Sequence, residues 1–427
     1  MSEKTAKDGN VAAIATMFAL FFMIAFVTNF AGSMGVIVKN QFGASNTASQ
    51  LGSAANFFAY LFMGIPGGLI LKRKGYKFTS LLAVAVGFVG VGVQLLSGYV
   101  SSFSVYVAGA FVAGFSMCML NLVVNPLLNT LGGEGKKGNQ LVQIGCSLNS
   151  VGATLAPILL GYLIGGEVAQ AKVADAAPAL MIAMGLFALA FIIIALSAIP
   201  EPHKETAEEK AARLAGGSSV LRDIVETLKF RHFTFGALGS FFYIIIECGI
   251  PNMANLYMTQ EGQPWYVGAT VAGSVVGAYW FCMMIGRLVG GAIGGKVSSK
   301  VMVTCCSVVG IALLLAAMFA PLKMVSAFGT TFPLSMGLVA LCGLCTSVMW
   351  GAIFNLAAEG LGKYVPMGSG IFMAMVFGGV CLPLQGFIAD KVGILNSYWM
   401  TIGLLAYVLV YAHVLSRPSK RADKLAE

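Results

Sequence analysis

Charged residues are scarce in this sequence. Asp, Glu, Lys and Arg make up 10% of its 427 residues, while 58% are hydrophobic. An ordinary soluble domain has roughly 25% charged residues. Because a membrane-spanning helix needs about 20 apolar residues, the charge-free stretch at 78–133 is long enough for two. The scarcity of charge excludes a soluble globular protein and predicts a polytopic membrane protein.

The residues of enzyme active sites are scarce as well. The three histidines, at positions 203, 232 and 413, fall at expected cytoplasmic helix ends or in the expected linker, so they cannot form a relay at membrane depth. The sequence shows no nucleophile, metal or phosphate-loop motif. It also lacks the cluster of acidic and basic residues that a membrane-embedded transferase needs. We therefore expect no enzymatic activity and no cofactor.

Positive charge is present, but it is concentrated on one side. The formal net charge is +9, and with a cytoplasmic N-terminus only Lys39, Lys172, Lys323 and Lys391 of the 26 Lys and Arg residues fall outside. Cytoplasmic loops of membrane proteins carry such an excess of Lys and Arg. We infer a multi-pass protein of a bacterial inner membrane with both termini cytoplasmic. The lipid bilayer is its partner, and no nucleic-acid site is expected.

The apolar stretches form two groups separated by a charged linker. Residues 200–232 contain twelve charged residues, and we expect an amphipathic helix on the membrane surface near Val220 to Phe230. Ten charge-free stretches, one of which holds two spans, and the helix around Glu247 predict twelve membrane-spanning helices. The expected protein is all-α, with an N-terminal six-helix half at 1–199, the linker at 200–232 and a C-terminal six-helix half at 233–427.

The two halves contain an internal repeat at a spacing of 223 residues. The residues shared at this offset are Gly67 and Gly290, Gly68 and Gly291, Lys77 and Lys300, and Gly87 and Gly310. The same offset places Asn252 opposite Asn29 and Trp280 opposite Phe57. Two six-helix halves related in this parallel sense are typical of transporters that alternate access around a central site.

An asparagine stripe lies in the apolar stretch from Gly114 to Gly133. Asn121, Asn125 and Asn129 recur every four residues, so they fall on one face of a helix. Amides in a hydrocarbon-embedded helix are costly unless they face a partner helix or a water-filled cavity. We therefore favour a lining of the transport pathway. The alternative is hydrogen-bonded contact between helices, since asparagines also bridge transmembrane helices.

Glu247 is the acidic residue that we place near the middle of a span. Intramembrane carboxylates are rare and usually functional. Burial penalises a charged carboxylate, so Glu247 can exchange a proton as the cavity around it alternates between wet and dry. The alternatives are a carboxylate that only hydrogen-bonds the ligand, one that helps to hold Na⁺, or a structural one.

Aromatic and basic residues narrow the class of ligand. Trp280 and Trp350 can stack on the apolar face of a sugar ring, although either can equally be a packing residue. Lys72, Arg73 and Arg287 are placed at cytoplasmic helix ends, where they would belong to gates between helices. An anionic ligand would then lack a countercharge at mid-membrane, which favours a neutral ligand.

Several segments match a known family. They are IPGGLILKRKGYK at 65–77, LNLVVNPLLNTLGG at 120–133, SLNSVGATLAP at 147–157, YWFCMMIGRL at 279–288, IFNLAAEGLG at 353–362 and GSGIFMAMVFGGVCLPLQGFIADKVGI at 368–394. By these segments the chain resembles, over most of its length, the fucose:proton symporter family of the major facilitator superfamily. That family includes L-fucose and glucose/galactose permeases.

The resemblance implies the major facilitator fold and a sugar site midway through the membrane between the halves. The implied contacts from the N-terminal half are Asn29, Asn121, Asn125 and Asn149. Those from the C-terminal half are Glu247, Asn252, Trp280, Trp350 and Gln385. Fucose-type members carry acidic residues associated with proton coupling where this chain has Gly32 and Asn121. Proton coupling, if present, therefore falls to another carboxylate, and Glu247 is our candidate.

We expect a monomeric secondary active transporter of a neutral sugar, working by alternating access. The sugar would be a hexose, a deoxyhexose or an N-acetylated sugar, and the co-transported ion H⁺ or Na⁺. The alternatives are an uncoupled sugar facilitator, or an exporter of small organic or lipophilic compounds, whose pocket should be aromatic with fewer amides. A non-transporting sugar sensor usually adds a long cytoplasmic domain.

Overall fold

Long apolar helices make up most of the protein in its computed structural model. The structure describes residues 11–26, 41, 51–133, 135–163, 173, 176–214, 220–260, 262–327 and 329–418. Within these ranges nine helices are long and apolar enough to cross a membrane. One of the nine, in α3, contains two crossings that meet at Gly75, where the backbone leaves the helical conformation. With α5 and the shorter helix Val11–Phe26, the described helices supply twelve crossings.

Six crossings precede the linker. The first is Val11–Phe26; its expected continuation to Val38 lies outside the described residues. The others are α3 (Leu51–Tyr99), α4 (Phe103–Leu131), α5 (Gly135–Leu163) and α6 (Ala177–Leu196). The expected split of the longest charge-free stretch near residues 98–102 is confirmed by the break between α3 and α4.

The linker and the second half complete the chain. The linker contains α7 (Ala207–Leu214) and α8 (Val220–Leu228). The first three crossings of the second half are α9 (Arg231–Met258), α10 (Gly268–Ile293) and α11 (Ser299–Phe319). A short antiparallel hairpin of β1 (Met324–Ala327) and β2 (Thr330–Pro333) follows. This hairpin was not expected from the sequence, because each of its strands has only four residues and it lies between two apolar helices.

The last three crossings are broken or capped by irregular helix. They are α12 (Leu334–Thr346) with α13 (Met349–Ala358), then α14 (Val365–Ala374) with the 3-10 segment η2 (Met375–Cys381) and α15 (Leu382–Val392), then α16 (Ile394–Val410) with the π-helical turn η3 (Tyr411–Leu415). A 3-10 turn, η1 (Gly362–Tyr364), precedes α14. Broken helices at membrane depth are tolerated where they are buried in protein or line a cavity.

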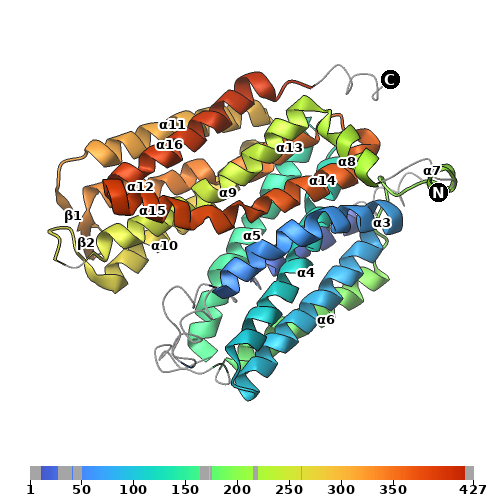
Figure 1. Ribbon diagram of the computed structural model, residues 1–427, viewed down its shortest axis with the longest axis horizontal. Helices are drawn as coiled ribbons and strands as arrows, with labels where there is room; N and C mark the ends of the chain where they lie inside the picture. The colour runs from blue at the N-terminus through green and yellow to red at the C-terminus, as the bar shows by residue number, and fades with distance from the viewer. Residues whose placement is uncertain are drawn as a thin grey trace.

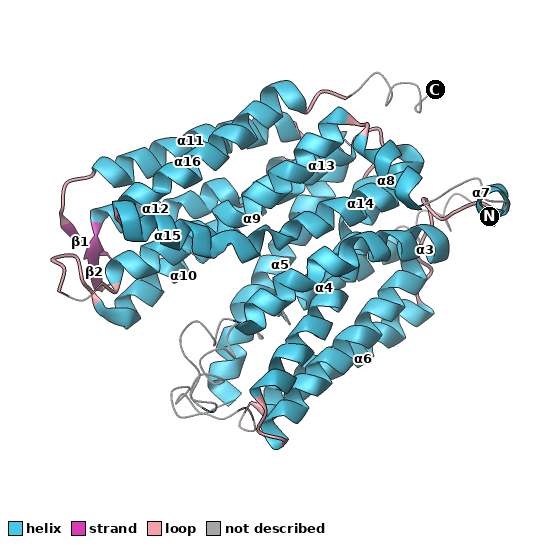
Figure 2. Ribbon diagram, viewed as in Figure 1, coloured by secondary structure: helices cyan, strands magenta, loops and turns pink. Residues whose placement is uncertain are grey.

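The two bundles lie closest together near the linker and diverge toward the opposite end (Figure 1). Helices account for nearly all of both bundles, and the small hairpin lies at the far end of the second bundle (Figure 2). Near the linker, α3 packs on α14 and α5 packs on α10. The central space is therefore closed on the linker side.

Glycines permit this close approach. A Cβ on Gly68 would lie 2.6 Å from the Pro366 carbonyl oxygen, and one on Gly64 would lie 2.6 Å from that of Gly370. Gly291, the repeat partner of Gly68, meets α5 at Ile144. Small residues let helix backbones approach in membranes, and here they do so where α3 meets α14 and where α5 meets α10.

The linker is fastened to the turn between the two crossings of α3. Gly75 adopts a φ of +88°, and the carboxylate of Glu201 occupies the space where its Cβ would be. That carboxylate accepts hydrogen bonds from the backbone N–H groups of Tyr76 and Lys77. It therefore caps the start of the next crossing, where helix N–H groups lack partners and a negative charge is favoured.

The internal repeat is also visible in the contacts of Lys77 and its repeat partner Lys300. Lys77 Nζ donates to the carbonyl oxygens of Ala195 and Ser197, 2.7 and 2.9 Å away, at the end of α6. Its repeat partner Lys300 donates to the carbonyl oxygen of His413, 3.3 Å away, at the end of the last crossing. In both halves a lysine thus neutralises the negative end of a helix dipole.

The amphipathic helix expected in the linker is present as α8, but protein contacts hold it. Lys72 Nζ lies 2.7 Å from Asp223 Oδ2, and α8 packs on α14. The organisation into 1–199, 200–232 and 233–427 stays a prediction, as do the side of the membrane on which the linker lies and the monomeric state.

The linker should lose its hold on α3 in acid. Burial lowers the pKa of His203 from 6.5 to about 4, and its Nδ1 lies 2.7 Å from the Tyr76 hydroxyl. Since the unfolded state binds the proton more readily, neutral His203 contributes stability above about pH 6.5, which is lost as the pH falls toward 4. Thermal unfolding in detergent should show a smaller drop over this window for His203→Gln than for the wild type.

The exposed His413 provides the control. His413→Gln should leave the acid-dependent drop unchanged. An equal drop for the wild type and both variants would contradict the assignment to His203.

Candidate functional site

A cavity of about 180 Å³ lies between the two halves, and both contribute to its wall. Its lining residues are Phe21, Ile24, Ala25, Phe57, Tyr60, Asn121, Cys146 and Asn149 from the first half, and Ile244, Glu247, Arg287, Trp350 and Val376 from the second. The wall thus combines amides, one ion pair and aromatic rings. Four of the expected site residues, Asn121, Asn149, Glu247 and Trp350, lie on it.

The amide wall is held in place by backbone and hydroxyl partners. Asn121 Nδ2 donates to the Tyr60 hydroxyl at 3.1 Å and to the Met117 carbonyl oxygen at 3.0 Å. Asn149 Nδ2 donates to the carbonyl oxygen of Phe21, 3.1 Å away on the first crossing. Each amide therefore enters the cavity with its orientation fixed.

The asparagine stripe divides along α4. Asn125 is fully buried and does not line the cavity; its Nδ2 donates to the carbonyl oxygen and side-chain Oδ1 of Asn121, at 3.0 and 3.3 Å. Asn129 is buried against Gly138, at the start of α5. Only the first of the three faces the cavity, and it also bonds to Tyr60 on α3.

Glu247 is positioned by a proline four residues after it. Pro251 has no N–H to offer the Glu247 carbonyl oxygen, which is left without its usual helical partner. The Tyr279 hydroxyl of α10 donates to this oxygen instead, at 3.0 Å, and lies 2.9 Å from Thr346 Oγ1. The hydrogen bond that α9 lacks at Pro251 is thus replaced by contacts that connect α9, α10 and α12 next to Glu247.

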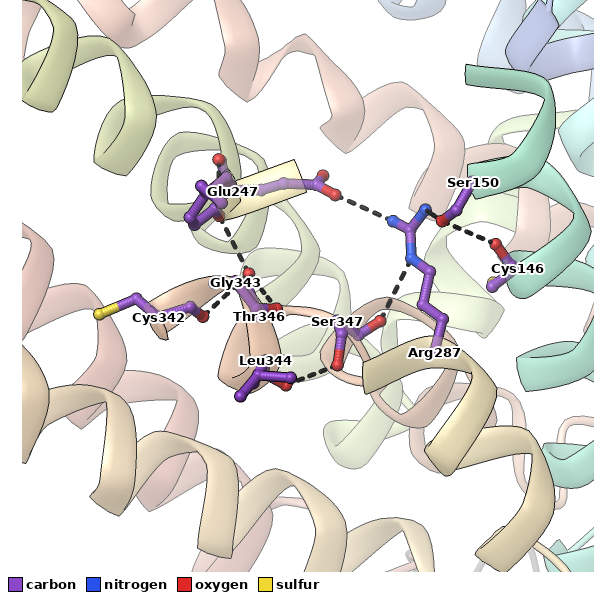
Figure 3. Close-up of polar contacts among 10 residues, drawn as sticks. Cys146, Ser150, Glu247, Arg287, Cys342, Gly343, Leu344, Thr346 and Ser347 are labelled. Atoms are coloured by element: carbon purple, nitrogen blue, oxygen red, sulfur yellow. Dashed lines mark hydrogen bonds and ion pairs between the residues drawn. The ribbon is translucent and has the colours of Figure 1, made fainter. Parts of the chain in front are cut away.

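Arg287 is the partner of Glu247, and its position corrects the expectation from the sequence. We expected it at a cytoplasmic helix end, away from the ligand. Its Nη2 instead lies 3.1 Å from Glu247 Oε1 (Figure 3). Arg287 as a whole is 9% exposed within the protein. The expectation failed because α10 continues six residues beyond Arg287, to Ile293, so the side chain reaches the cavity rather than the helix end.

Two further groups hold the guanidinium. Its Nη1 donates to Ser150 Oγ at 2.8 Å, and its Nε donates to the Ser347 carbonyl oxygen at 3.4 Å (Figure 3). Ser347 lies in the break between α12 and α13. The cavity therefore contains one positive and one negative side chain in contact, which leaves no net charge for an ionic ligand to neutralise.

Trp350 packs against two aromatic rings. Its ring lies 6.0 Å from that of Tyr243 and 5.4 Å, edge to face, from that of Phe372. This packing fixes a flat apolar surface at the cavity wall, opposite the amides of the first half.

Besides Asn125, three other expected ligand contacts do not line this cavity. Trp280 is 43% exposed within the protein, and its ring packs edge to face on Tyr279. Gln385 is buried and donates from Nε2 to Thr401 Oγ1 at 3.0 Å. Asn252 is exposed, and Asn29 lies outside the described residues. Trp280 was misplaced because a motif shared with a family does not give the side of a helix that faces the cavity.

The other two expected gate residues lie at the linker end. Lys72 pairs with Asp223, as described above, and Arg73 is exposed. Their part in a gate stays a prediction.

Sequence reasoning missed several residues around the ion pair. The Tyr60 and Tyr279 hydroxyls and Ser150 hold the functional side chains. Pro251, four residues after the only mid-span carboxylate we had identified, was a signal that its carbonyl oxygen needs another donor. The partners themselves come from other helices, so no local pattern could name them.

Comparisons with known proteins agree with this architecture. The model of the Major Facilitator Superfamily matches residues 16–379. A glucose/galactose transporter of Brucella abortus biovar 1 (strain 9-941) is 28% identical, over 95% of this chain and 94% of that protein. The L-fucose-proton symporter of Escherichia coli K12 is 21% identical, over 94% of this chain and 93% of that protein.

The fold is also found in a solved structure. The crystal structure of the fucose:proton symporter FucP of Escherichia coli superposes with a TM-score of 0.77 at 20% identity, covering 95% of this chain and 98% of that one. The family match spans most of the chain, and the described helices lie in two groups, before and after the linker. This chain belongs to the major facilitator superfamily and is a multi-pass membrane transporter rather than an enzyme.

Proposed function

We propose that this protein transports a neutral sugar together with a proton, by alternating access around the cavity between its halves. The observation that carries the proposal is the Glu247–Arg287 ion pair in a wall of fixed amides and one packed tryptophan. Relatives named as glucose/galactose transporters and an L-fucose-proton symporter support the choice of ligand and ion.

The wall suits a polyhydroxylated ligand. Asn121 offers its Oδ1 as an acceptor, because both of its amide N–H groups are already bonded, and Asn149 offers its Oδ1 and its second N–H. The ion pair adds charged donors and acceptors whose charges cancel. A sugar ring also has an apolar face, which can stack on Trp350. A lipophilic compound would leave the polar atoms of this wall that lack a protein partner without one, at a cost of about 1–3 kcal/mol each, so an exporter of such compounds is disfavoured.

Glu247 is the proposed site of proton coupling. Its carboxylate is 14% exposed and its charge is balanced by Arg287. An unpaired buried charge is costly, so breaking the pair favours the neutral acid. A sugar hydroxyl that competes for Arg287 or Glu247 would therefore bring a proton onto the carboxylate, and both would travel together. Binding of Na⁺ at Glu247 is the competing explanation.

Uptake into proteoliposomes tests the substrate and the ion together. With a panel of hexoses, deoxyhexoses and N-acetylated sugars, and with pH and Na⁺ gradients imposed separately, the wild type should accumulate at least one sugar when the outside is acidic. If only a Na⁺ gradient drives accumulation, the co-transported ion is Na⁺ rather than a proton. Equilibration of the sugar without accumulation would indicate a facilitator. Failure to bind or move any sugar would overturn the substrate class.

Replacing Glu247 by Gln tests the coupling site. Gln keeps the size of the side chain but cannot gain or lose a proton, so uphill accumulation should be abolished while exchange of sugar across the membrane continues. Asp390→Asn removes an exposed carboxylate from the end of α15 and serves as the matched control. Normal pH-driven accumulation by Glu247→Gln would remove Glu247 from the coupling mechanism.

A pair of tryptophan variants tests the sugar-stacking surface. Trp350→Ala should raise the KM for the sugar roughly five- to tenfold, which corresponds to an aromatic contact of about 1–1.5 kcal/mol. Trp350→Phe should recover part of the loss. The matched control Trp280→Ala removes the same ring from outside the cavity and should change KM less than twofold, roughly the variation of an ordinary surface substitution. Equal effects of both alanine variants would contradict the assignment.

A further inference from the structure

Helix α5 carries a stripe of polar side chains that bond to the second half. Asn139 Nδ2 donates to Met302 Sδ at 3.2 Å, and Gln143 Nε2 donates to the Val348 carbonyl oxygen at 2.9 Å. Ser150 Oγ accepts from Arg287 Nη1 at 2.8 Å. Spacings of four and seven residues place all three on one face of the helix. The stripe runs from the linker end of α5 to the cavity.

The stripe must open if the cavity is to open toward the linker. All three bonds join the first half to the second, on the side where the two bundles are closed. The first two involve neutral groups. The third involves a guanidinium, and hydrogen bonds to charged groups contribute about twice as much as neutral ones. The bond nearest the cavity is therefore the strongest of the three.

Arg287 belongs both to this stripe and to the proposed coupling site. One of its terminal nitrogens reaches Ser150 in the first half and the other reaches Glu247 in the second, as Figure 3 shows. The guanidinium is planar and its donors have fixed directions. A shift of Arg287 toward or away from Glu247 therefore changes its bond to Ser150.

We propose that Ser150 is the positioning residue through which the state of the Glu247–Arg287 pair controls the contact between the two halves on the linker side. The proposal rests on the proposed symport, and it assigns to Ser150 a part in conformational control rather than in sugar binding. While Glu247 is charged, it holds Arg287 in place to bond Ser150, and the linker side stays closed.

Protonation reverses this balance. A proton from the cavity that settles on a carboxylate oxygen of Glu247 neutralises that carboxylate and ends the ion pair. Arg287 is then a buried charge with only neutral partners, which costs free energy until water reaches it. Separation of α5 from α10 would admit that water. Opening toward the linker is thus favoured only after the proton has bound, which is the condition that a symporter has to meet.

Ser150→Ala is the test, with Ser147→Ala as its matched control. Both serines are buried on α5, and both also donate to a carbonyl oxygen of the preceding turn. Only Ser150 bonds to Arg287. Loss of this bond should move the population toward the state open to the linker, and raise the KM for sugar offered from the other side roughly tenfold, the weight of one hydrogen bond to a charged group. Ser147→Ala should leave KM within twofold, roughly the effect of a neutral change.

A double-mutant cycle separates this role from a merely structural one. Because Ser150 and Glu247 act through the same guanidinium, Ser150→Ala should change the KM of sugar exchange much less in the Glu247→Gln background than in the wild type. Ser147→Ala and Glu247→Gln should be additive. Hydrogen exchange should also become faster in residues 135–150 of Ser150→Ala but not of Ser147→Ala, without a change in melting temperature.

The outcomes distinguish this inference from the proposed function. If the wild type transports sugar with a proton but Ser150→Ala matches Ser147→Ala in KM and hydrogen exchange, Ser150 has no role in the closure and only this inference fails. Additivity of Ser150→Ala and Glu247→Gln would likewise overturn it. If the wild type neither binds nor moves sugar, the proposed function fails; faster hydrogen exchange specific to Ser150→Ala would still support control of the closure.

Discussion

The ion pair between Glu247 and Arg287 is the interaction on which the rest of the site depends. At 3.1 Å and with both side chains largely buried, each charge is stable only because of the other. The pair permits polar chemistry at the centre of a protein that is 58% hydrophobic. It also leaves the cavity without net charge, so the wall selects for hydrogen bonding and for an apolar ring face rather than for an ionic group.

The fold supplies this pair through departures from regular helix. Pro251 frees the carbonyl oxygen to which Tyr279 donates, and the break after α12 brings the Ser347 carbonyl oxygen to Arg287. Glycines at the linker end let the bundles close tightly enough for α5 to reach across. Irregular backbone and small residues, which weaken a helix in isolation, are here what bring two charged side chains and their hydrogen-bond partners to one point.

Much of the fold could be predicted from the sequence, because hydrophobic length and charge bias are local properties. Twelve crossings, the charged linker and the break before α4 follow from them. The site was harder. Asn121, Asn149, Glu247 and Trp350 were recognised as polar or aromatic residues in apolar helices, and they meet at the cavity. Arg287 and Trp280 were misplaced because the depth and rotation of a helix are set by packing against other helices, which no single segment encodes.

The central claim is that the Glu247–Arg287 pair takes up a proton when the sugar binds. Calorimetric titration of the purified protein with its sugar, in buffers of different ionisation enthalpy, measures that proton directly. The account predicts that the wild type takes up protons on binding sugar and that Glu247→Gln binds sugar with no proton uptake. Sugar binding without proton uptake by the wild type, or the same uptake by Glu247→Gln, would contradict it.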